Sequence, residues 1–127
     1  MAAVFVALGE KPGQVAGFYT LSSFTIEAGE IPTEMAKKLP RYGGIPAVLI
    51  GRLAVHSDFQ GRHLGKFLLL DALAKVIEAG KTIAAWAVVV EAKDESAASF
   101  YERYGFRKFP THPHRLFLPV ATARQVF

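Results

Sequence analysis

A basic, glycine-containing turn between two apolar runs constrains this chain more than any other feature. Residues 47–55 are mostly apolar and of strand length, and residues 64–79 form an apolar run of helix length. The turn between them holds Gly61 and Gly65 beside Arg62 and Lys66, with no acid after Asp58. The first amides of a helix lack intrahelical partners and carry the positive end of its dipole, and glycine lets an anion approach closely. The pattern favours a phosphate-binding turn; an ordinary strand-to-helix turn with surface cations is the alternative.

The spacing of this turn excludes the two common nucleotide fingerprints. It is one residue too short for G-x-x-x-x-G-K-[ST], and Phe67 stands where a magnesium-binding hydroxyl is needed. The pattern G-x-G-x-x-G is also absent there. The expected phosphate ligand therefore belongs to another class.

A second motif lies in residues 94–106 and has the signature of a short helix. Asp94 is a good N-cap, and Gly105 suits the position just past the helix end. Ala97, Phe100 and Tyr101 recur at helical spacing. The sequence therefore predicts a helix here, with aromatic rings on one face.

Both motifs resemble those of the GNAT superfamily of N-acetyltransferases. Residues 60–65 resemble its acetyl-CoA pyrophosphate loop, [QR]-x-x-G-x-[GA], and residues 97–106 match its pattern A-x-x-F-Y-x-x-x-G-F. The one departure is His63, which stands where the first glycine of the loop usually lies. We expect His63 to take a negative φ, as in a first helical turn, since that region tolerates any side chain.

The resemblance extends over nearly the whole chain and narrows to the GNAT toxins of bacterial toxin–antitoxin pairs, through residues 15–21, 31–42 and 45–55. It implies a cytoplasmic, acetyl-CoA-dependent enzyme that acetylates the amino group of aminoacyl-tRNA. It also implies a homodimer and an antitoxin protein as partners. Two alternatives stay open: an N-acetyltransferase of a small amine or a protein N-terminus, and a non-catalytic module that binds CoA or an antitoxin.

The resemblance also assigns roles to individual residues. Tyr101 holds the position of the general acid, and a phenol with an ordinary pKa near 10 suits protonation of a thiolate. The alternative for Tyr101 is a core aromatic packed beside Phe100. Strand amides from Leu53 to Val55 polarise the thioester if the sheet splays there and leaves them unpaired. The expected cofactor-binding set is Leu53, Ala54, Val55, Gln60, Gly61, Arg62, His63, Leu64, Gly65, Lys66, Asp94, Ala97 and Phe100.

The order of periodic segments predicts one α/β domain over residues 1–127, with a mixed, mostly antiparallel sheet flanked by helices. The expected strands are residues 3–8, 15–25, 47–55, 83–90, 106–109 and 115–120, and the expected helices begin near Pro32, Leu64 and Asp94. A turn with Pro12 and Gly13 at its centre joins the first two strands. GNAT proteins usually begin with a further strand and two helices, which this chain lacks, so we expect its acceptor half to be incomplete.

Charge and composition add weaker constraints. The chain carries a net charge of +4, and residues 103–127 contain five Lys or Arg and no acid. A one-sign segment suggests a polyanion such as tRNA, although an ordinary basic surface or the phosphates of CoA would also account for it. The chain has no cysteine and hence no thiol nucleophile or disulfide, and its apolar runs are too short to cross a bilayer.

No metal and no dedicated general base are expected. His112 and His114 flank a proline, but two histidines without a third nearby ligand favour a structural or phosphate-facing role. His56 and Asp58 fit turn positions, and Glu91 lies at the end of a strand. The α-amine of an aminoacyl ester is more acidic than a lysine ammonium, so it needs less help to lose its proton.

Overall fold

A single mixed sheet forms the frame of the protein. The computed structural model describes residues 2–39, 44–61, 63–80 and 84–127. Six strands lie in the order β1-β2-β3-β4-β6-β5, and all neighbours are antiparallel except β3 and β4. The expected mixed, mostly antiparallel α/β fold is confirmed. The strands are β1 (Ala3–Leu8), β2 (Val15–Ile26), β3 (Ile45–Val55), β4 (Ala87–Glu91), β5 (Arg107–Phe109) and β6 (His112–Pro119).

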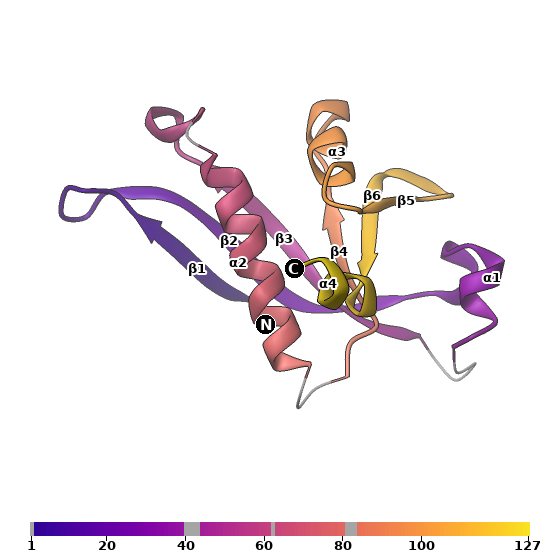
Figure 1. Cartoon of the computed structure of the whole chain (residues 1–127). Coiled ribbons are helices and arrows are strands. Elements are labelled where there is room, and N and C mark those ends of the chain that lie inside the picture. The colour runs from indigo at the N-terminus through magenta and orange to yellow at the C-terminus, as the bar shows by residue number, and fades with distance from the viewer. Residues whose placement is uncertain (1, 40–43, 62, 81–83) are drawn as a thin grey trace.

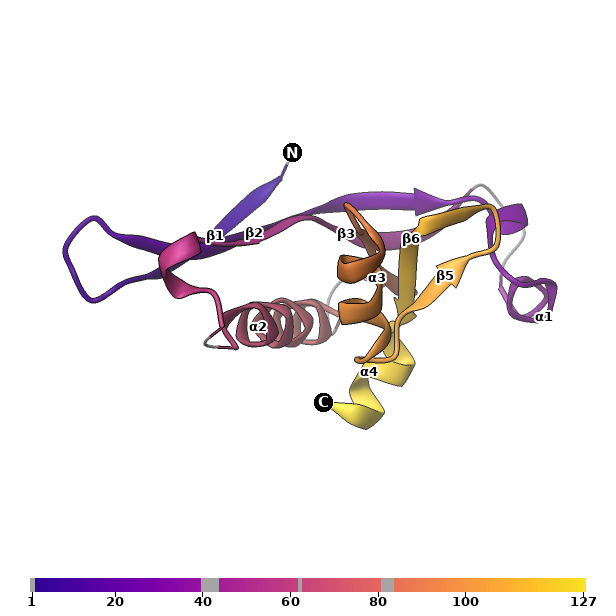
Figure 2. The same ribbon diagram turned by 90° about the horizontal axis from the view of Figure 1, so that it is seen from above.

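The helices are distributed unequally over the two faces of this sheet (Figures 1 and 2). The long helix α2 (Leu64–Ala79) lies along one side of β1–β3, and α3 (Glu95–Glu102) and α4 (Val120–Val126) follow further along. The short helix α1 (Thr33–Ala36) lies at the far end of the molecule from the β1–β2 turn. Two short 3₁₀ turns complete the fold: η1 (Ala28–Glu30) and η2 (Ser57–Phe59).

The core has two parts because strand side chains alternate between faces. In β4, Val88 and Val90 pack with α2, α3 and α4, whereas Ala87 and Val89 pack on the other face with Phe109 and Phe117. All the residues from Ala87 to Val90 are at most 1% exposed. A continuous apolar run is what a strand covered on both faces requires.

Most expected elements are present, with differences at their ends. Helix α2 has the expected bounds, and Gly13 has a φ of 75°, as a type II turn with proline at its second position needs. The expected strand at residues 83–90 begins only at Ala87; Ile83 lies outside the described residues. The apolar residues just before it instead serve packing, since the Trp86 ring stacks on Phe117 at 5.8 Å between centroids.

Helix α4 was absent from the sequence prediction, which ended the chain's last strand at Val120. Val120 and Ala123, three residues apart, are buried against the α2 side of the sheet. The segment is too short for its helical period to stand out from the apolar strand before it.

The sheet edge at β1 differs from the covered middle. Val4, Val6 and Leu8 are 61%, 50% and 75% exposed, while the alternate residues Phe5 and Ala7 pack against the core. Across the described residues, the helices are all too short or too polar to cross a membrane.

Candidate active site

Helix α2 begins in a backbone conformation that glycine adopts most readily. His63, the N-cap, has φ 59° and ψ 21°, in the left-handed region, and Gly61 before it has φ 83°. The expectation of a negative φ at His63 is therefore wrong. Asn, Asp and His enter this region more often than other side chains, at a cost in strain. The position requires positive φ, which accounts physically for a glycine at this point of the loop pattern.

The N-terminus of α2 is left open by its own sequence. The His63 side chain makes no capping hydrogen bond, and the first turn holds no acid. The first intrahelical bond runs from Phe67 N to His63 O at 3.1 Å, so the amides of Leu64, Gly65 and Lys66 point out of the helix end. Such an end attracts anions through its N–H groups and its dipole.

A cleft of about 410 Å³ lies between this helix start and α3. The charged residues in its described lining are cations, Lys66 and Arg103, with no carboxylate. A side chain added at Gly65 would lie 3.8 Å from the Phe100 ring, so the loop and α3 face each other closely. The described lining is Val55, Phe59, Gln60, Gly61, His63, Leu64, Gly65, Lys66, Phe100, Arg103 and Tyr104. Its charge and open amides suit the pyrophosphate of acetyl-CoA.

The sheet splays next to this cleft. Strand β3 pairs with β4 only from Ala47 to Ile50, while β3 itself continues to Val55. Figure 1 shows β3 running on under α2 while β4 turns toward α3. Among the described residues, the C-terminal end of β3 therefore has β2 on one side and no strand on the other.

A β-bulge in β3 decides which amides face this opening. Two β3 residues, Gly51 and Arg52, stand opposite the single residue Thr20, so the alternation of the strand reverses there. Past the bulge, Arg52 N bonds the Thr20 hydroxyl and His56 N bonds Ala16 O, both toward β2. By alternation, the amide of Ala54 also points to β2, and those of Leu53 and Val55 point into the opening. Of the three expected strand residues, Leu53 and Val55 thus have amides that face the opening, and their role in polarising a carbonyl stays a prediction.

Tyr101 lies on α3 beside Phe100, one of the aromatic residues that line the cleft. It is 6% exposed, and its ring lies 5.2 Å from Phe100 and 5.6 Å from Phe106, between centroids. Burial raises the pKa of the Tyr101 phenol to about 12. The hydroxyl therefore stays protonated at neutral pH, as a proton donor must. Its role as general acid stays a prediction, and both the catalytic and the core interpretations are compatible with this burial.

Four of the expected cofactor-binding residues are absent from the described lining of the cleft: Leu53, Ala54, Asp94 and Ala97. Asp94 caps α3, its side chain accepting from Ala97 N at 2.8 Å. Gln60 donates from Nε2 to Val55 O at 3.4 Å, which ties the turn to the strand end. The ring of His56 accepts from Asp58 N at 3.2 Å, so these two act as turn residues, as expected. Arg62 lies outside the described residues.

Three cleft residues were missing from the sequence prediction: Phe59, Arg103 and Tyr104. Arg103 and Tyr104 could have been found, because they lie three and four residues after Phe100 and so share its helix face. Phe59 carries no such signal, since it lies in a turn.

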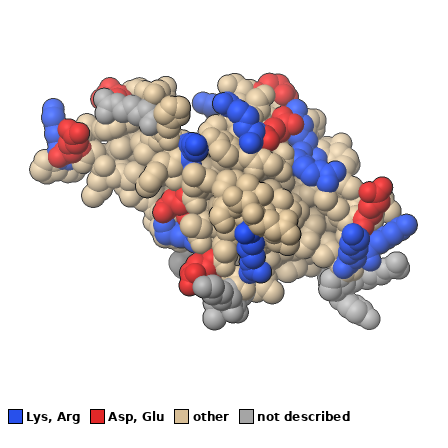
Figure 3. Space-filling model, viewed as in Figure 1, with Lys and Arg blue, Asp and Glu red and all other residues tan. Residues whose placement is uncertain are grey.

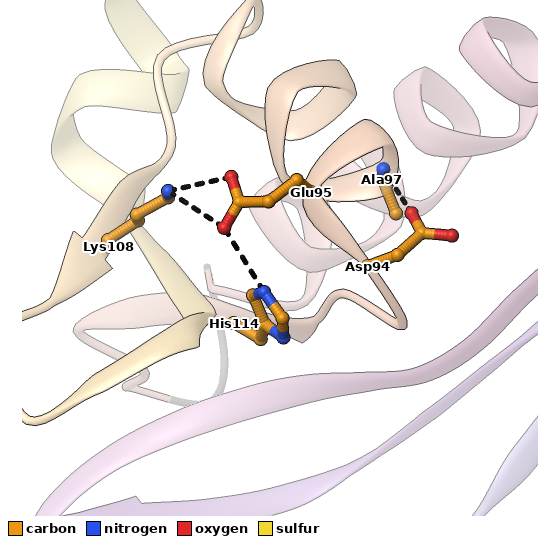
Figure 4. Close-up of polar contacts among 5 residues, drawn as sticks. All are labelled: Asp94, Glu95, Ala97, Lys108 and His114. Carbon is orange, nitrogen blue, oxygen red and sulfur yellow. Dashed lines mark hydrogen bonds and ion pairs between the residues drawn. The ribbon is translucent and has the colours of Figure 1, made fainter.

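The basic C-terminal segment is less free than its sequence indicates. Lys108 Nζ pairs with Glu95 at 3.2 Å, and His114 Nε2 lies 3.1 Å from the same carboxylate (Figure 4). Arg115 pairs with Glu30 at 3.5 Å and with Glu91 at 3.2 Å. On the face in Figure 3, blue and red groups alternate over α3 and the β5–β6 side. The acids come from elsewhere in the chain, so local charge overstates the positive surface.

Within the described part of the chain, no group of three His, Cys, Asp or Glu residues could hold a metal ion. His112 pairs with Glu30 at 3.5 Å and His114 with Glu95. Both histidines are thus engaged with separate carboxylates from different elements, Glu30 and Glu95.

Comparison with known proteins agrees with the site. Residues 2–108 match the acetyltransferase (GNAT) domain. The chain is 35% identical, over 90% of its length, to the tRNA-acetylating toxin of Mycobacterium tuberculosis (strain ATCC 25618 / H37Rv), covering 68% of that protein. It is 29% identical, over 97% of its length, to a probable toxin TacT of Sinorhizobium fredii (strain NBRC 101917 / NGR234), covering 72% of it.

Solved structures of toxins share the fold closely. The crystal structure of a tyrosine-to-phenylalanine mutant of KacT matches with a TM-score of 0.90 at 31% identity, over 98% of this chain and 74% of that one. AtaT complexed with acetyl-methionyl-tRNAfMet matches with a TM-score of 0.88 at 31% identity, over 98% and 74%. A tyrosine-to-phenylalanine mutant of AtaT bound to acetyl-CoA and the C-terminus of the antitoxin AtaR matches with a TM-score of 0.79 at 27% identity, over 98% and 71%.

The splayed sheet, the open start of α2 and the cationic cleft define an acetyl-CoA-dependent acyltransferase. The chain belongs to the GNAT acetyltransferase family, and its similarity to tRNA-acetylating toxins is the closest guide to its acceptor.

Proposed function

We propose that this protein transfers the acetyl group of acetyl-CoA to the amino group of aminoacyl-tRNA and acts as the toxin of a toxin–antitoxin pair. The observation that best supports acetyl transfer is the cationic cleft at the open N-terminus of α2, beside a splayed sheet. The tRNA acceptor is supported by the similarity to a tRNA-acetylating toxin and to AtaT complexed with an acetylated tRNA.

The first task of the site is to hold the donor. The amides of Leu64, Gly65 and Lys66 would bind the pyrophosphate, and Lys66 and Arg103 would add positive charge. Acetyl-CoA supplies an activated acetyl thioester. The amides of Leu53 and Val55 point into the opening where its carbonyl would receive hydrogen bonds.

The second task is proton transfer at the departing sulfur. Tyr101 lies on α3 and is protonated at neutral pH, so its hydroxyl would donate to the sulfur as the carbon–sulfur bond breaks. Tyr19, the other buried phenol among the described residues, already donates its hydroxyl hydrogen to Asp71.

The test is acetyl transfer from radiolabelled acetyl-CoA to purified, charged tRNA. Charged tRNA should be labelled on the amino acid, and uncharged tRNA should stay unlabelled. A small-amine and peptide panel measures the alternative acceptors. Donor binding without transfer to any of these acceptors would instead identify the non-catalytic module.

A matched pair of charge reversals separates tRNA from small acceptors. Arg107 is exposed on β5, and its guanidinium lies 6.0 Å from the Phe117 ring, on the face of the sheet opposite α2. Arg107→Glu should weaken the tRNA reaction and lower its salt dependence by about one counterion. Lys11→Glu changes the net charge equally at the distant β1–β2 turn and should have little effect. Equal effects of the two changes would exclude local tRNA contact at β5.

We further propose an antitoxin partner, a homodimer and a cytoplasmic location. An antitoxin is supported by the AtaT complex with the C-terminus of AtaR. The exposed apolar row Val4, Val6 and Leu8 on β1 supports assembly, since exposed edge strands pair readily. Mass measurement in solution, with and without Val6→Lys, tests the dimer.

A further inference from the structure

Glu91 lies where strands β3 and β4 separate, and its carboxylate has no role in the site described above. It is the last residue of β4 and follows Val90, which is the last β4 residue paired with β3. Val90 pairs with Ile50, so Leu53, whose amide faces the opening, lies only about 7 to 10 Å further along the strand direction. Glu91 is thus the closest β4 side chain to the reacting position.

Glu91 lies on the face of the sheet opposite the face that packs against Tyr101, the proposed general acid. In β4, Val88 and Val90 belong to the core cluster that contains Tyr101, and Val89 belongs to the cluster on the other face. Glu91 follows the parity of Val89, and its partner Arg115 likewise follows that of Phe117. Tyr101 and Glu91 therefore approach the splay from opposite faces of the sheet.

Within the described part of the chain, Arg115 fixes one oxygen of the Glu91 carboxylate and leaves the other oxygen without a hydrogen bond. Its Oε1 accepts from Arg115 Nη2 at 3.2 Å, while Arg115 Nη1 bonds Glu30 at 3.5 Å and the guanidinium lies 5.3 Å from the Phe24 ring. Arg115 is thereby fixed by three elements, β2, β4 and η1. Among the described residues Oε2 of Glu91 has no partner, and the side chain is 53% exposed.

A cavity of about 290 Å³ has Glu91 in its lining. It is lined by Glu91, Ala92, His112, Pro113, His114 and Arg115, at the C-terminal end of β4. The group's charged surroundings are Arg115, then Glu30 and His112 behind it. Because Arg115 uses Nη1 on Glu30 and Nη2 on Oε1 of Glu91, the second oxygen of Glu91 is available to accept a hydrogen bond from an amine.

We propose that Glu91 binds the acceptor amine and receives its proton, with the cavity at the end of β4 admitting the amine from the face opposite the donor cleft. This rests on the proposed N-acetyltransferase function. The acceptor nitrogen bonds the acetyl carbon as the carbon–sulfur bond breaks. The sulfur takes the Tyr101 proton, and the nitrogen loses one proton to Glu91, which solvent exchange returns to the tyrosinate. Glu91 is thus a catalytic residue, and Arg115 is a positioning residue.

The experiment compares Glu91→Gln, Glu91→Asp and Glu30→Gln with the unchanged protein. Glu30→Gln breaks an ion pair on the other side of the same Arg115 and so controls for structural loss, and Glu10→Gln at the β1–β2 turn controls for charge. The measurements are acetyl-CoA affinity, and kcat and KM for two acceptors, charged tRNA and an amino-acid ethyl ester.

Glu91→Gln should keep acetyl-CoA affinity and lower kcat/KM for the acceptor about 10²-fold or more, the usual effect of losing a general base. Glu91→Asp should restore part of the activity, and Glu30→Gln should stay within about tenfold of the unchanged protein. A Glu91→Gln rate equal to that of Glu30→Gln would overturn the proposal, as would loss of acetyl-CoA binding in Glu91→Gln alone. If the unchanged protein acetylates the ester but not tRNA, only the tRNA acceptor fails, and Glu91 is judged on the ester. If it acetylates neither, both proposals fall.

Discussion

The two helices that face each other across the cleft begin in opposite ways. Helix α3 starts with its own cap: the Asp94 carboxylate accepts from Ala97 N, and Glu95 supplies a negative charge in the first turn. Helix α2 starts at a left-handed His63 with no side-chain cap and no acid in its first turn. Both helices have the same set of unpaired amides. Only α2 leaves them to a ligand.

This contrast assigns a task to each helix. The open end of α2 can bind an anion, because its N-cap His63 makes no side-chain cap and its first turn holds no acid. The closed end of α3 is satisfied internally and further fixed by Lys108 and His114 on Glu95 (Figure 4). Helix α3 is therefore suited to hold Tyr101 in place rather than to bind phosphate. The predictions that follow test this division, from the largest effect to the smallest.

The largest effect is expected at Tyr101. Tyr101→Phe should lower kcat about 10²- to 10⁴-fold, as loss of a general acid does, while acetyl-CoA affinity stays within about twofold. Single-turnover transfer and calorimetric donor binding measure the two quantities. Tyr104→Phe, at an aromatic neighbour two residues past the end of α3, is the matched control and should keep most turnover. Full activity in Tyr101→Phe would leave only the core interpretation for that ring.

The sequence predicts the two helix starts unequally well. Asp94 as the cap of α3 and the bounds of α2 follow from local chemistry, since caps and apolar period are written in neighbouring residues. The left-handed conformation at His63 could not be predicted from neighbouring residues, because a histidine adopts positive φ at only a small fraction of positions. The glycine that the GNAT loop pattern has at this position indicates positive φ. The expectation of a negative φ at His63 did not take that glycine into account.

The same limit applies to charges that pair over long distances. Lys108 and Arg115 lie in a segment without acids, yet Glu95, Glu30 and Glu91 reach them from other elements. Which acid meets which base depends on strand register, as in the pairing of Glu91 with Arg115 between β4 and β6. The β3 bulge that aims Leu53 and Val55 at the opening is likewise a property of pairing with β2. Neither is visible in local sequence.

The second effect, on donor binding, is expected from closing α2 in the manner of α3. His63→Asp would place a carboxylate at the phosphate-binding end, where it competes for the amides and repels the ligand. We expect acetyl-CoA affinity to fall about 30-fold, equivalent to about 2 kcal/mol. His63→Asn also tolerates positive φ but carries no charge, and it should change affinity by less than about threefold. If both variants bind like the unchanged protein, the donor does not use this helix end.

The third effect comes from opening α3 in the manner of α2. Asp94→Ala removes the cap and should lower the free energy of unfolding by about 1 kcal/mol, as measured by urea denaturation. Asp94→Asn can still accept from Ala97 N and should lose much less. Acetyl-CoA affinity should change little in either variant. A large loss of donor affinity in Asp94→Asn would show that the Asp94 charge, rather than its cap, serves the cleft.

The smallest effect concerns the charge that keeps the start of α3 fixed. Lys108 first, and His114 second, lower the pKa of the exposed Glu95 carboxyl below its ordinary 4.5. Because the folded-state pKa lies below the unfolded one, the stabilisation is present above the unfolded pKa and is lost as pH falls through the folded pKa. Urea unfolding of the unchanged protein and Lys108→Met from about pH 7 down to about pH 3 should give curves that differ slightly at neutral pH and converge in acid. Lys37→Met, on the exposed end of α1, should keep a constant offset over this range. A Lys108→Met difference that persists in acid would mean that Lys108 acts through packing, and the closed start of α3 would then rest on Asp94 alone.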